Sequence, residues 1–239
     1  MITNPSVEQK GKSNTTRGVM RWLFRETTGV LGQAAILFLS VGRWNWAMGW
    51  AFVIATTLWV GATALVVIPR NPDLLAERLG PRKGAKTWDA VIMSIIGPAL
   101  IACYIVAGLD VRYGWTRISL PLQIAALVIV VLGYALIVWA TAANAFFSSI
   151  VRIQKERGHT VATGGPYRFV RHPAYVGGIA IYIATPVMLG SLWALIPGGL
   201  SAVLMIVRTA LEDKTLLNEL DGYREYAQRV HYRLIPGIW

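Results

Sequence analysis

The chain has 239 residues, of which 55% are hydrophobic and only 15% are charged. Soluble globular domains usually carry about 25% charged residues, so this composition excludes an ordinary soluble protein and favours one that lies in a membrane. The formal net charge is +11 at pH 7, but no basic block with interleaved aromatic residues is present, and we expect no nucleic-acid partner. The single cysteine, Cys103, lies in an apolar run, which excludes a disulfide framework and a thiolate metal site.

The first two regions of the chain are a polar tail and a set of apolar segments. Residues 1–26 are polar and basic, and we expect them to form a cytoplasmic tail. Residues 27–147 hold four charge-free segments, which predict transmembrane helices because about 20 apolar residues suffice to cross a bilayer. These segments are 27–42, 44–68, 90–109 and 120–146. The first is short, so we expect Arg25 and Arg43 to extend to the two membrane surfaces beside it.

Residues 148–239 are expected to form the catalytic region. This region contains a charge-free run, 172–207, which as one helix would be about 54 Å long and therefore too long for a single crossing. The run predicts a helical hairpin that turns near Gly190 and Ser191. Pro186 and Pro197 are expected to kink its two arms.

Beyond the hairpin, apolar residues recur at spacings of four and three, which predicts a one-faced amphipathic helix. These residues are Leu216, Leu220, Tyr223, Ala227 and Val230. The pair Asp221-Gly222 can divide this helix in two. The fold class is therefore all-α: a polytopic integral membrane protein with about six transmembrane helices, a C-terminal helical hairpin among them, and a cytoplasmic C-terminal amphipathic helix.

The distribution of positive charge predicts the orientation in the membrane. With six spans, only Arg43, Arg112 and Arg117 of the 23 Lys and Arg residues fall in the loops opposite the termini. Cytoplasmic segments of membrane proteins are enriched in Lys and Arg, so the termini and the segment around Arg168 are expected to face the cytoplasm.

The stretch GHTVATGGPYRFVRHPAYVGG, residues 158–178, leaves a basic loop and enters an apolar helix. Proline is favoured at the first helical position, which places His172 at the cap and Pro173 at the helix start. The backbone N–H groups of residues 174–176 would then suit an anion. A simpler interpretation treats Arg168 and Arg171 as membrane-surface anchors and the stretch as an ordinary helix entry.

A second group of polar residues, Arg208, Glu212 and Asp213, follows the last apolar run. Residues four apart share a helix face, so Arg208 and Glu212 point the same way and can form an ordinary ion pair. Ionisable groups at the edge of a membrane core more often belong to a functional site. His159 and His172 lack the further ligands that a metal ion requires, and we expect no metal.

The segment GPYRFVRHPAYVG, combined with the downstream Arg208-x-x-x-Glu212-Asp213, resembles the isoprenylcysteine carboxyl methyltransferase family and its bacterial relatives. The resemblance covers roughly residues 145–239. It implies a cytoplasm-facing site for S-adenosylmethionine in a multi-pass protein, of the bacterial inner membrane rather than the endoplasmic reticulum. The cofactor-binding residues that it implies are Gln154, His159, Thr160, Val161, Ala162, Tyr167, His172, Pro173, Ala174, Tyr175 and Glu212. Arg208 would bind the methyl acceptor, and Arg208 and Glu212 would be the catalytic residues.

The chemistry of these residues suits that assignment. S-Adenosylmethionine carries a carboxylate, an ammonium and a sulfonium, for which the helix start at Pro173, Glu212 and a tyrosine ring are suitable partners. The expected partners are the lipid bilayer and a lipophilic acceptor, prenylated or a small molecule, whose carboxylate is methylated. Two other methyltransferases fit as alternatives: a phospholipid N-methyltransferase and a small-thiol S-methyltransferase. From other classes, an NADPH-dependent membrane sterol or enone reductase and a non-catalytic scaffold stay open.

Overall fold

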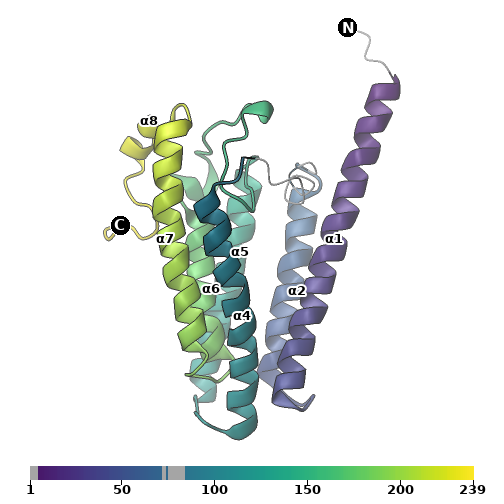
Figure 1. The fold of residues 1–239 in the computed structure, drawn as a ribbon, viewed down its shortest axis with the longest axis vertical. Coiled ribbons are helices and arrows are strands. Elements are labelled where there is room, and N and C mark those ends of the chain that lie inside the picture. The colour runs from purple at the N-terminus through teal and green to yellow at the C-terminus, as the bar shows by residue number, and fades with distance from the viewer. Residues whose placement is uncertain (1–4, 72–73, 75–83) are drawn as a thin grey trace.

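The computed structural model describes residues 5–71, 74 and 84–239 (Figure 1). All regular elements in these ranges are helices, which confirms the all-helical class. The elements are α1 (Pro5–Val41), α2 (Ala47–Val67), α4 (Thr87–Tyr113), α5 (Leu120–Ala143), η1 (Lys155–Arg157), η2 (Gly165–Arg168), α6 (Pro173–Met188), α7 (Leu195–Glu219) and α8 (Tyr223–Arg229).

Four helices in the described ranges, α2, α4, α5 and α7, are long and apolar enough to cross a membrane. Helix α6 is apolar but has only 16 residues, which corresponds to about 24 Å. Helix α1 begins at Pro5, so the segment expected to start at Thr27 is the second half of one continuous helix. No proline interrupts the chain between Pro5 and Pro69, which allows this helix to extend through the polar tail.

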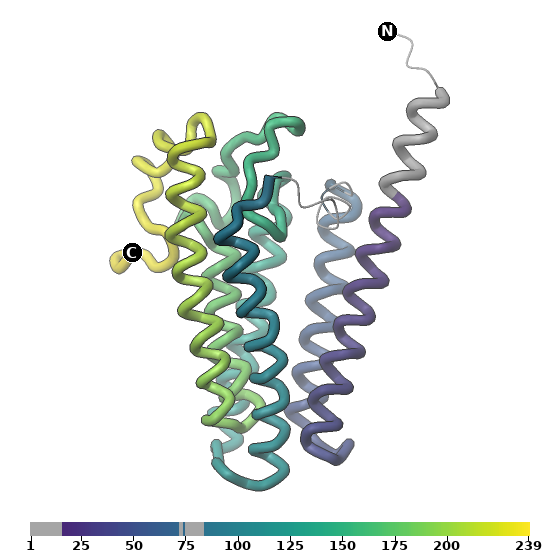
Figure 2. The backbone as a smooth tube through the Cα atoms, in the orientation of Figure 1, coloured from purple at the N-terminus to yellow at the C-terminus, as the bar shows by residue number. Residues whose placement is uncertain are grey.

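The long helices form an elongated bundle in which α1 and α2 lie on one side and α4 to α7 on the other (Figure 1). Helix α5 packs against α6 and α2, and α4 packs against α1 and α7. The α5–α6 contact is close because Gly133 and Gly177 face each other: a Cβ at Gly177 would lie 2.5 Å from the Gly133 carbonyl oxygen. The long segment between α5 and α6 lies with α8 at the end of the bundle opposite the C-terminal end of α1 (Figure 2).

The predicted hairpin is present and comprises α6 and α7. Its turn is at Gly190, whose φ of +87° favours glycine, and at Ser191, whose N–H donates to the Pro186 carbonyl. Pro186 lies inside α6, as expected. The prediction of a kink at Pro197 is wrong, because Pro197 lies in the first turn of α7, where no intrahelical N–H bond is needed.

The predicted break near Asp221-Gly222 is also present. Helix α7 continues to Glu219, Gly222 adopts a φ of +79°, and α8 begins at Tyr223. The break turns α8 back, so that Tyr223 and Tyr226 are buried against the segment between α5 and α6 and against the start of α6. The C-terminal apolar residues thereby become part of the wall of a cavity.

Candidate active site

A cavity lies at this end of the bundle, between the segment that follows α5, the start of α6, the end of α7, and α8. It encloses about 740 Å³ of empty space, part of it open to solvent. Nine residues expected from the sequence line it: His159, Thr160, Val161, Ala162, Tyr167, His172, Ala174, Tyr175 and Glu212. The structure thus brings together residues separated by more than 50 positions in the chain.

Three other expected residues do not line this cavity: Gln154, Pro173 and Arg208. The Gln154 side chain is fully buried and holds the loop together, donating from Nε2 to the Phe146 carbonyl at 2.8 Å and accepting from Arg157. A direct contact between Gln154 and a ligand in the cavity is therefore not supported, because its amide is already occupied by the loop.

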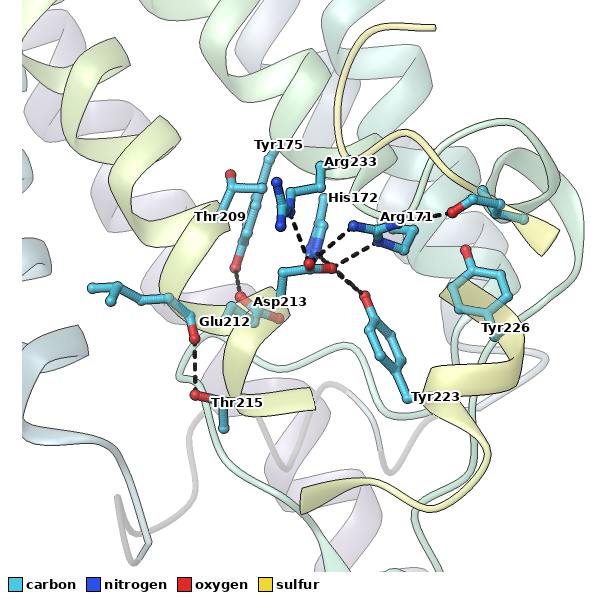
Figure 3. Close-up of polar contacts among 12 residues, drawn as sticks. Arg171, His172, Tyr175, Thr209, Glu212, Asp213, Thr215, Tyr223, Tyr226 and Arg233 are labelled. Carbon is cyan, nitrogen blue, oxygen red and sulfur yellow. Dashed lines mark hydrogen bonds and ion pairs between the residues drawn. The ribbon is translucent and has the colours of Figure 1, made fainter. Parts of the chain in front are cut away.

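The carboxylate of Asp213 is the centre of the polar network beside the cavity (Figure 3). It is completely buried, and Oδ1 accepts from Arg171 Nε at 2.8 Å and from the Tyr223 hydroxyl at 2.8 Å. Oδ2 accepts from Arg171 Nη2 at 2.9 Å and from Arg233 Nε at 2.8 Å. His172 Nε2 lies 3.2 Å from Oδ1. One carboxylate thus joins the entrance of α6, the start of α8 and the C-terminal tail.

The C-terminal tail is fastened to the same place by backbone hydrogen bonds. The N–H groups of Arg171 and His172 donate to the carbonyls of Tyr232 and Arg233, each at 2.9 Å. Arg171 Nη1 also donates to the Val230 and His231 carbonyls. Two guanidinium groups therefore surround one carboxylate, which leaves an excess of positive charge beside the His172 end of the cavity.

Glu212, the neighbour of Asp213, faces the cavity instead and accepts a hydrogen bond from the Tyr175 hydroxyl. Tyr167 forms another part of the wall: its carbonyl accepts from the Tyr226 hydroxyl at 2.7 Å, and Asn144 Nδ2 donates to its phenol oxygen at 3.3 Å. Burial raises the pKa of the Tyr167 hydroxyl, so this group stays protonated. The cavity thus has an acidic side at Glu212 and neutral aromatic walls.

His159 lies on the opposite loop, stacked on Phe146 with ring centroids 4.6 Å apart. Its Nδ1 accepts from the Gln154 backbone N–H at 3.2 Å. Burial, and then the nearby charges of Arg157 and Arg152, lower the pKa of His159 to about 4, so the imidazole is neutral at neutral pH. His159 therefore offers the cavity a flat neutral ring.

Arg208 lies one helical turn below Glu212, and Asp89 at the start of α4 is its ion-pair partner. Nε donates to Asp89 Oδ1 at 2.7 Å, and Nη2 donates to the Ser149 carbonyl at 3.2 Å. The alternative of a simple Arg208–Glu212 ion pair is wrong, because the guanidinium turns toward α4. Its Cζ lies 5.3 Å from the centre of the Tyr175 ring, so Tyr175 separates Arg208 from the cavity.

The expected anion site at the start of α6 is only partly present. His172 caps the helix and Pro173 begins it, as predicted. The N–H groups of Tyr175 and Val176, however, already donate to the His172 carbonyl at 3.0 and 3.3 Å. The prediction that they are available to a ligand is wrong, because the first turn closes on its own cap.

Sequence reasoning missed several residues of this site. Asp89 directly precedes the apolar segment 90–109, and no role is predicted for it from the sequence, although a lone acid at the edge of an apolar run is a recognisable signal. Tyr223 and Leu220 were assigned to the apolar face of a surface helix, whereas they line the cavity. Asn144 and Phe146 were treated as the end of a membrane span, but α5 stops at Ala143 and releases them into the wall.

Residues 125–218 match the sequence profile of the isoprenylcysteine carboxyl methyltransferase (ICMT) family. This segment contains most of α5, the loop with His159, all of α6 and nearly all of α7. The matched segment therefore supplies most of the cavity wall, and α8 closes the cavity from outside the matched range.

Two curated proteins are similar to parts of this chain. Methanethiol S-methyltransferase 1 of Bradyrhizobium diazoefficiens is 41% identical over 71 residues, which cover 29% of this chain and 24% of that protein. A probable protein-S-isoprenylcysteine O-methyltransferase of Oryza sativa subsp. indica is 32% identical over 87 residues, which cover 36% of this chain and 46% of that protein. The chain thus matches less than half the length of these curated relatives.

A solved structure of a eukaryotic intramembrane Ras methyltransferase, ICMT, is similar over 95% of this chain and 94% of that chain. The TM-score is 0.50 and the sequence identity is 18%. At this identity the likeness establishes a shared fold for nearly the whole chain.

The Asp213 network yields a stability prediction. Asp213→Asn removes the charge that compensates Arg171 and Arg233, and breaking a buried pair in this way typically costs about 3–5 kcal/mol. We expect a lower melting temperature for the purified protein in detergent and faster proteolysis of the C-terminal tail. Asp221→Asn, at an exposed acid in the turn before α8, is the matched control. Equal melting temperatures for the two variants would refute the structural role of Asp213.

Proposed function

We propose that this protein is an S-adenosylmethionine-dependent methyltransferase that methylates the carboxylate of a lipophilic, prenylcysteine-like acceptor at the membrane surface. The observation that carries the proposal is the charge pattern of the cavity, with Glu212 on one side and the surplus of positive charge at Arg171 on another. Because the chain matches only part of each curated relative, this activity is our inference from the site.

The residues present fit S-adenosylmethionine. Glu212 suits the ammonium of the cofactor. The backbone N–H groups at the start of α6 are largely occupied, so the positively charged side of the cavity near Arg171 and His172 is the better partner for the cofactor carboxylate. The rings of Tyr167 and Tyr175 can attract the sulfonium by cation–π contact. When bound, the cofactor supplies an electrophilic methyl group.

The chain's own residues have three tasks in this reaction. The first is to hold the methyl donor in one orientation, which we assign to Glu212, His172 and the loop 159–162. The second is to exclude water, which we assign to Tyr167, Tyr223 and Tyr226. The third is to orient the acceptor carboxylate, which we assign to Arg208. An acceptor carboxylate is itself the nucleophile and needs no general base, which fits a wall with no free basic side chain among the described residues except the neutral His159.

Arg208 is placed to meet an acceptor that arrives from the bilayer. It lies deeper along α7 than Glu212, and its Nη1 has no hydrogen-bond partner among the described residues. Asp89 and the Ser149 carbonyl fix the rest of the guanidinium. We therefore assign Asp89 as a positioning residue that directs one edge of Arg208 toward the acceptor.

The membrane arrangement is part of the same proposal. We infer six spans, with α1 and α6 added to the four longer apolar helices. We place the cavity on the cytoplasmic side, because most of the Lys and Arg residues that the structure describes lie at that end of the bundle. We favour a bacterial inner membrane as the setting. We place α8 against the loop after α5 rather than on the lipid surface, because Tyr223 and Tyr226 are buried.

A second function, S-methylation of a small thiol, is favoured by one observation: the 41% identity to the methanethiol S-methyltransferase. A small thiol requires neither a lateral entrance from the bilayer nor a cation for a carboxylate. Arg208 and its support by Asp89 would then have no task in binding the acceptor.

The first experiment measures methyl transfer from radiolabelled S-adenosylmethionine by the purified protein to a prenylcysteine mimic, with methanethiol in parallel. We expect a base-labile methyl ester on the prenylcysteine carboxylate. NADPH with an enone substrate serves as the control for the reductase class. Transfer to methanethiol alone would support the second function, and NADPH oxidation without any methyl transfer would overturn both.

The next prediction concerns cofactor affinity. Glu212→Gln removes a charge-assisted hydrogen bond to the cofactor ammonium, a loss of about 1.5–3 kcal/mol, so we expect affinity for S-adenosylmethionine to fall at least about tenfold. Calorimetry measures this on folded protein. Glu219→Gln is the control, because Glu219 lies on the same helix as Glu212 but pairs at the surface with Lys86, which precedes α4. Unchanged affinity in Glu212→Gln would contradict the assignment.

The last prediction of this set concerns the acceptor. Arg208→Lys keeps a positive charge opposite Asp89 but cannot hold a carboxylate by two parallel bonds, so we expect turnover to fall by about tenfold or more. Cofactor affinity and melting temperature should change little. Near-normal turnover, or a loss of melting temperature as large as in Asp89→Asn, would show instead that Arg208 only stabilises the fold.

A further inference from the structure

A second cavity lies within the membrane-spanning part of the bundle, among α1, α2, α4, α5 and α6. It holds about 700 Å³ of empty space, part of it open to the surroundings, and shares no lining residue with the candidate active site. Its position among apolar helices would favour a purely hydrocarbon lining. The wall instead contains the polar residues Gln33, Thr56, Trp59, Tyr134, Tyr182 and Thr185.

Two buried polar atoms in this wall have no hydrogen-bond partner in the described part of the chain: Trp59 Nε1 and Thr185 Oγ1. Thr185 is only 3% exposed. Unpaired polar groups are costly in a membrane interior, where no water compensates them.

Thr185 differs from the other threonines inside the apolar helices. Thr56, Thr63 and Thr141 each donate to the carbonyl four residues earlier, at 2.8 to 3.0 Å. This back-bonding is the usual way in which a helical threonine satisfies its hydroxyl. Thr185 does not use it, and its hydroxyl is left for the cavity.

A route from the bilayer leads to this cavity. A groove between α2 and α5 has almost entirely apolar walls, which include Leu58, Ala62 and Val138. Trp59 and Tyr134 line both the groove and the cavity, and their rings stack with centroids 5.1 Å apart. The stacked pair therefore forms the boundary between the lipid-facing groove and the polar cavity.

We propose that this cavity is a binding site for a lipophilic molecule that carries a hydrogen-bond-accepting oxygen, such as a ketone or an alcohol. The oxygen would accept from Trp59 Nε1 or the Thr185 hydroxyl, and the apolar body would lie in the α2–α5 groove. A plain hydrocarbon cannot satisfy these donors, so the polar atom confers the selectivity. The molecule is either the methyl acceptor, through a polar group within its tail, or a separate membrane lipid.

The test uses two photoreactive probes on the full chain in lipid nanodiscs: a long-chain dialkyl ketone that carries a diazirine, and the matched diazirine alkane. We expect the ketone, but not the alkane, to label peptides that contain Trp59, Tyr134 or Thr185. Thr185→Val, nearly isosteric, should lower ketone labelling about fivefold, the equivalent of one hydrogen bond. Thr141→Val is the matched control, because Thr141 is equally buried but back-bonded to Ile137.

Equal labelling by ketone and alkane, or unchanged labelling in Thr185→Val, would overturn the proposal, as would a cavity that holds water and excludes both probes. The labelling is read without cofactor, so it stands even if methyl transfer fails. Added ketone then distinguishes the two sources in the transfer assay. If the ketone competes with the prenylcysteine mimic for methyl transfer, the natural occupant of the cavity is the acceptor. If the rate of methyl transfer is unchanged, the occupant is a separate lipid.

Discussion

The buried carboxylate of Asp213 is the interaction on which the candidate site depends. It contacts Arg171 and His172 before α6, Tyr223 in α8 and Arg233 in the tail, so segments that are distant in sequence meet at two oxygen atoms. A buried charge requires such full compensation, and each partner in turn needs the carboxylate. The network therefore holds α8 and the tail in place as a wall of the cavity, a task that the short apolar contacts of a seven-residue helix could not perform alone.

Glu212 and Asp213 have different partners because of helix geometry. Consecutive residues of an α-helix point about 100° apart, so two adjacent acids cannot face the same partner. One direction leads to the guanidinium groups of Arg171 and Arg233, which Asp213 binds. The other leads to the cavity, where Glu212 accepts a hydrogen bond from the Tyr175 hydroxyl. The surplus positive charge at Arg171 and the negative charge at Glu212 are thereby separated across one cavity. Such a separation is what a zwitterionic ligand requires.

Hydropathy and local rules predicted much of the fold, since the four long apolar helices, the turn at Gly190 and Ser191 and the break before α8 depend on neighbouring residues. The same rules placed His172 and Pro173 at the start of α6. They failed where partners are distant: Arg208 and Asp89 are 119 positions apart, and nothing near Arg208 indicates its partner. They also failed for Gln154, because a glutamine amide can bind a ligand or a backbone carbonyl equally well, and here it binds the Phe146 carbonyl.

The Arg208–Asp89 pair connects the membrane bundle to the cavity. Asp89 Oδ2 accepts from the Val151 N–H at 2.8 Å while Oδ1 holds Arg208, so α4, α7 and the loop after α5 meet at one carboxylate. Arg208 lies beneath the Tyr175 ring, and the hydroxyl of that ring donates to Glu212. A group that approaches Arg208 from the bilayer would therefore lie one aromatic ring away from a ligand held by Glu212. Tyr175, in the first turn of α6, is then the boundary that an acceptor carboxylate must pass.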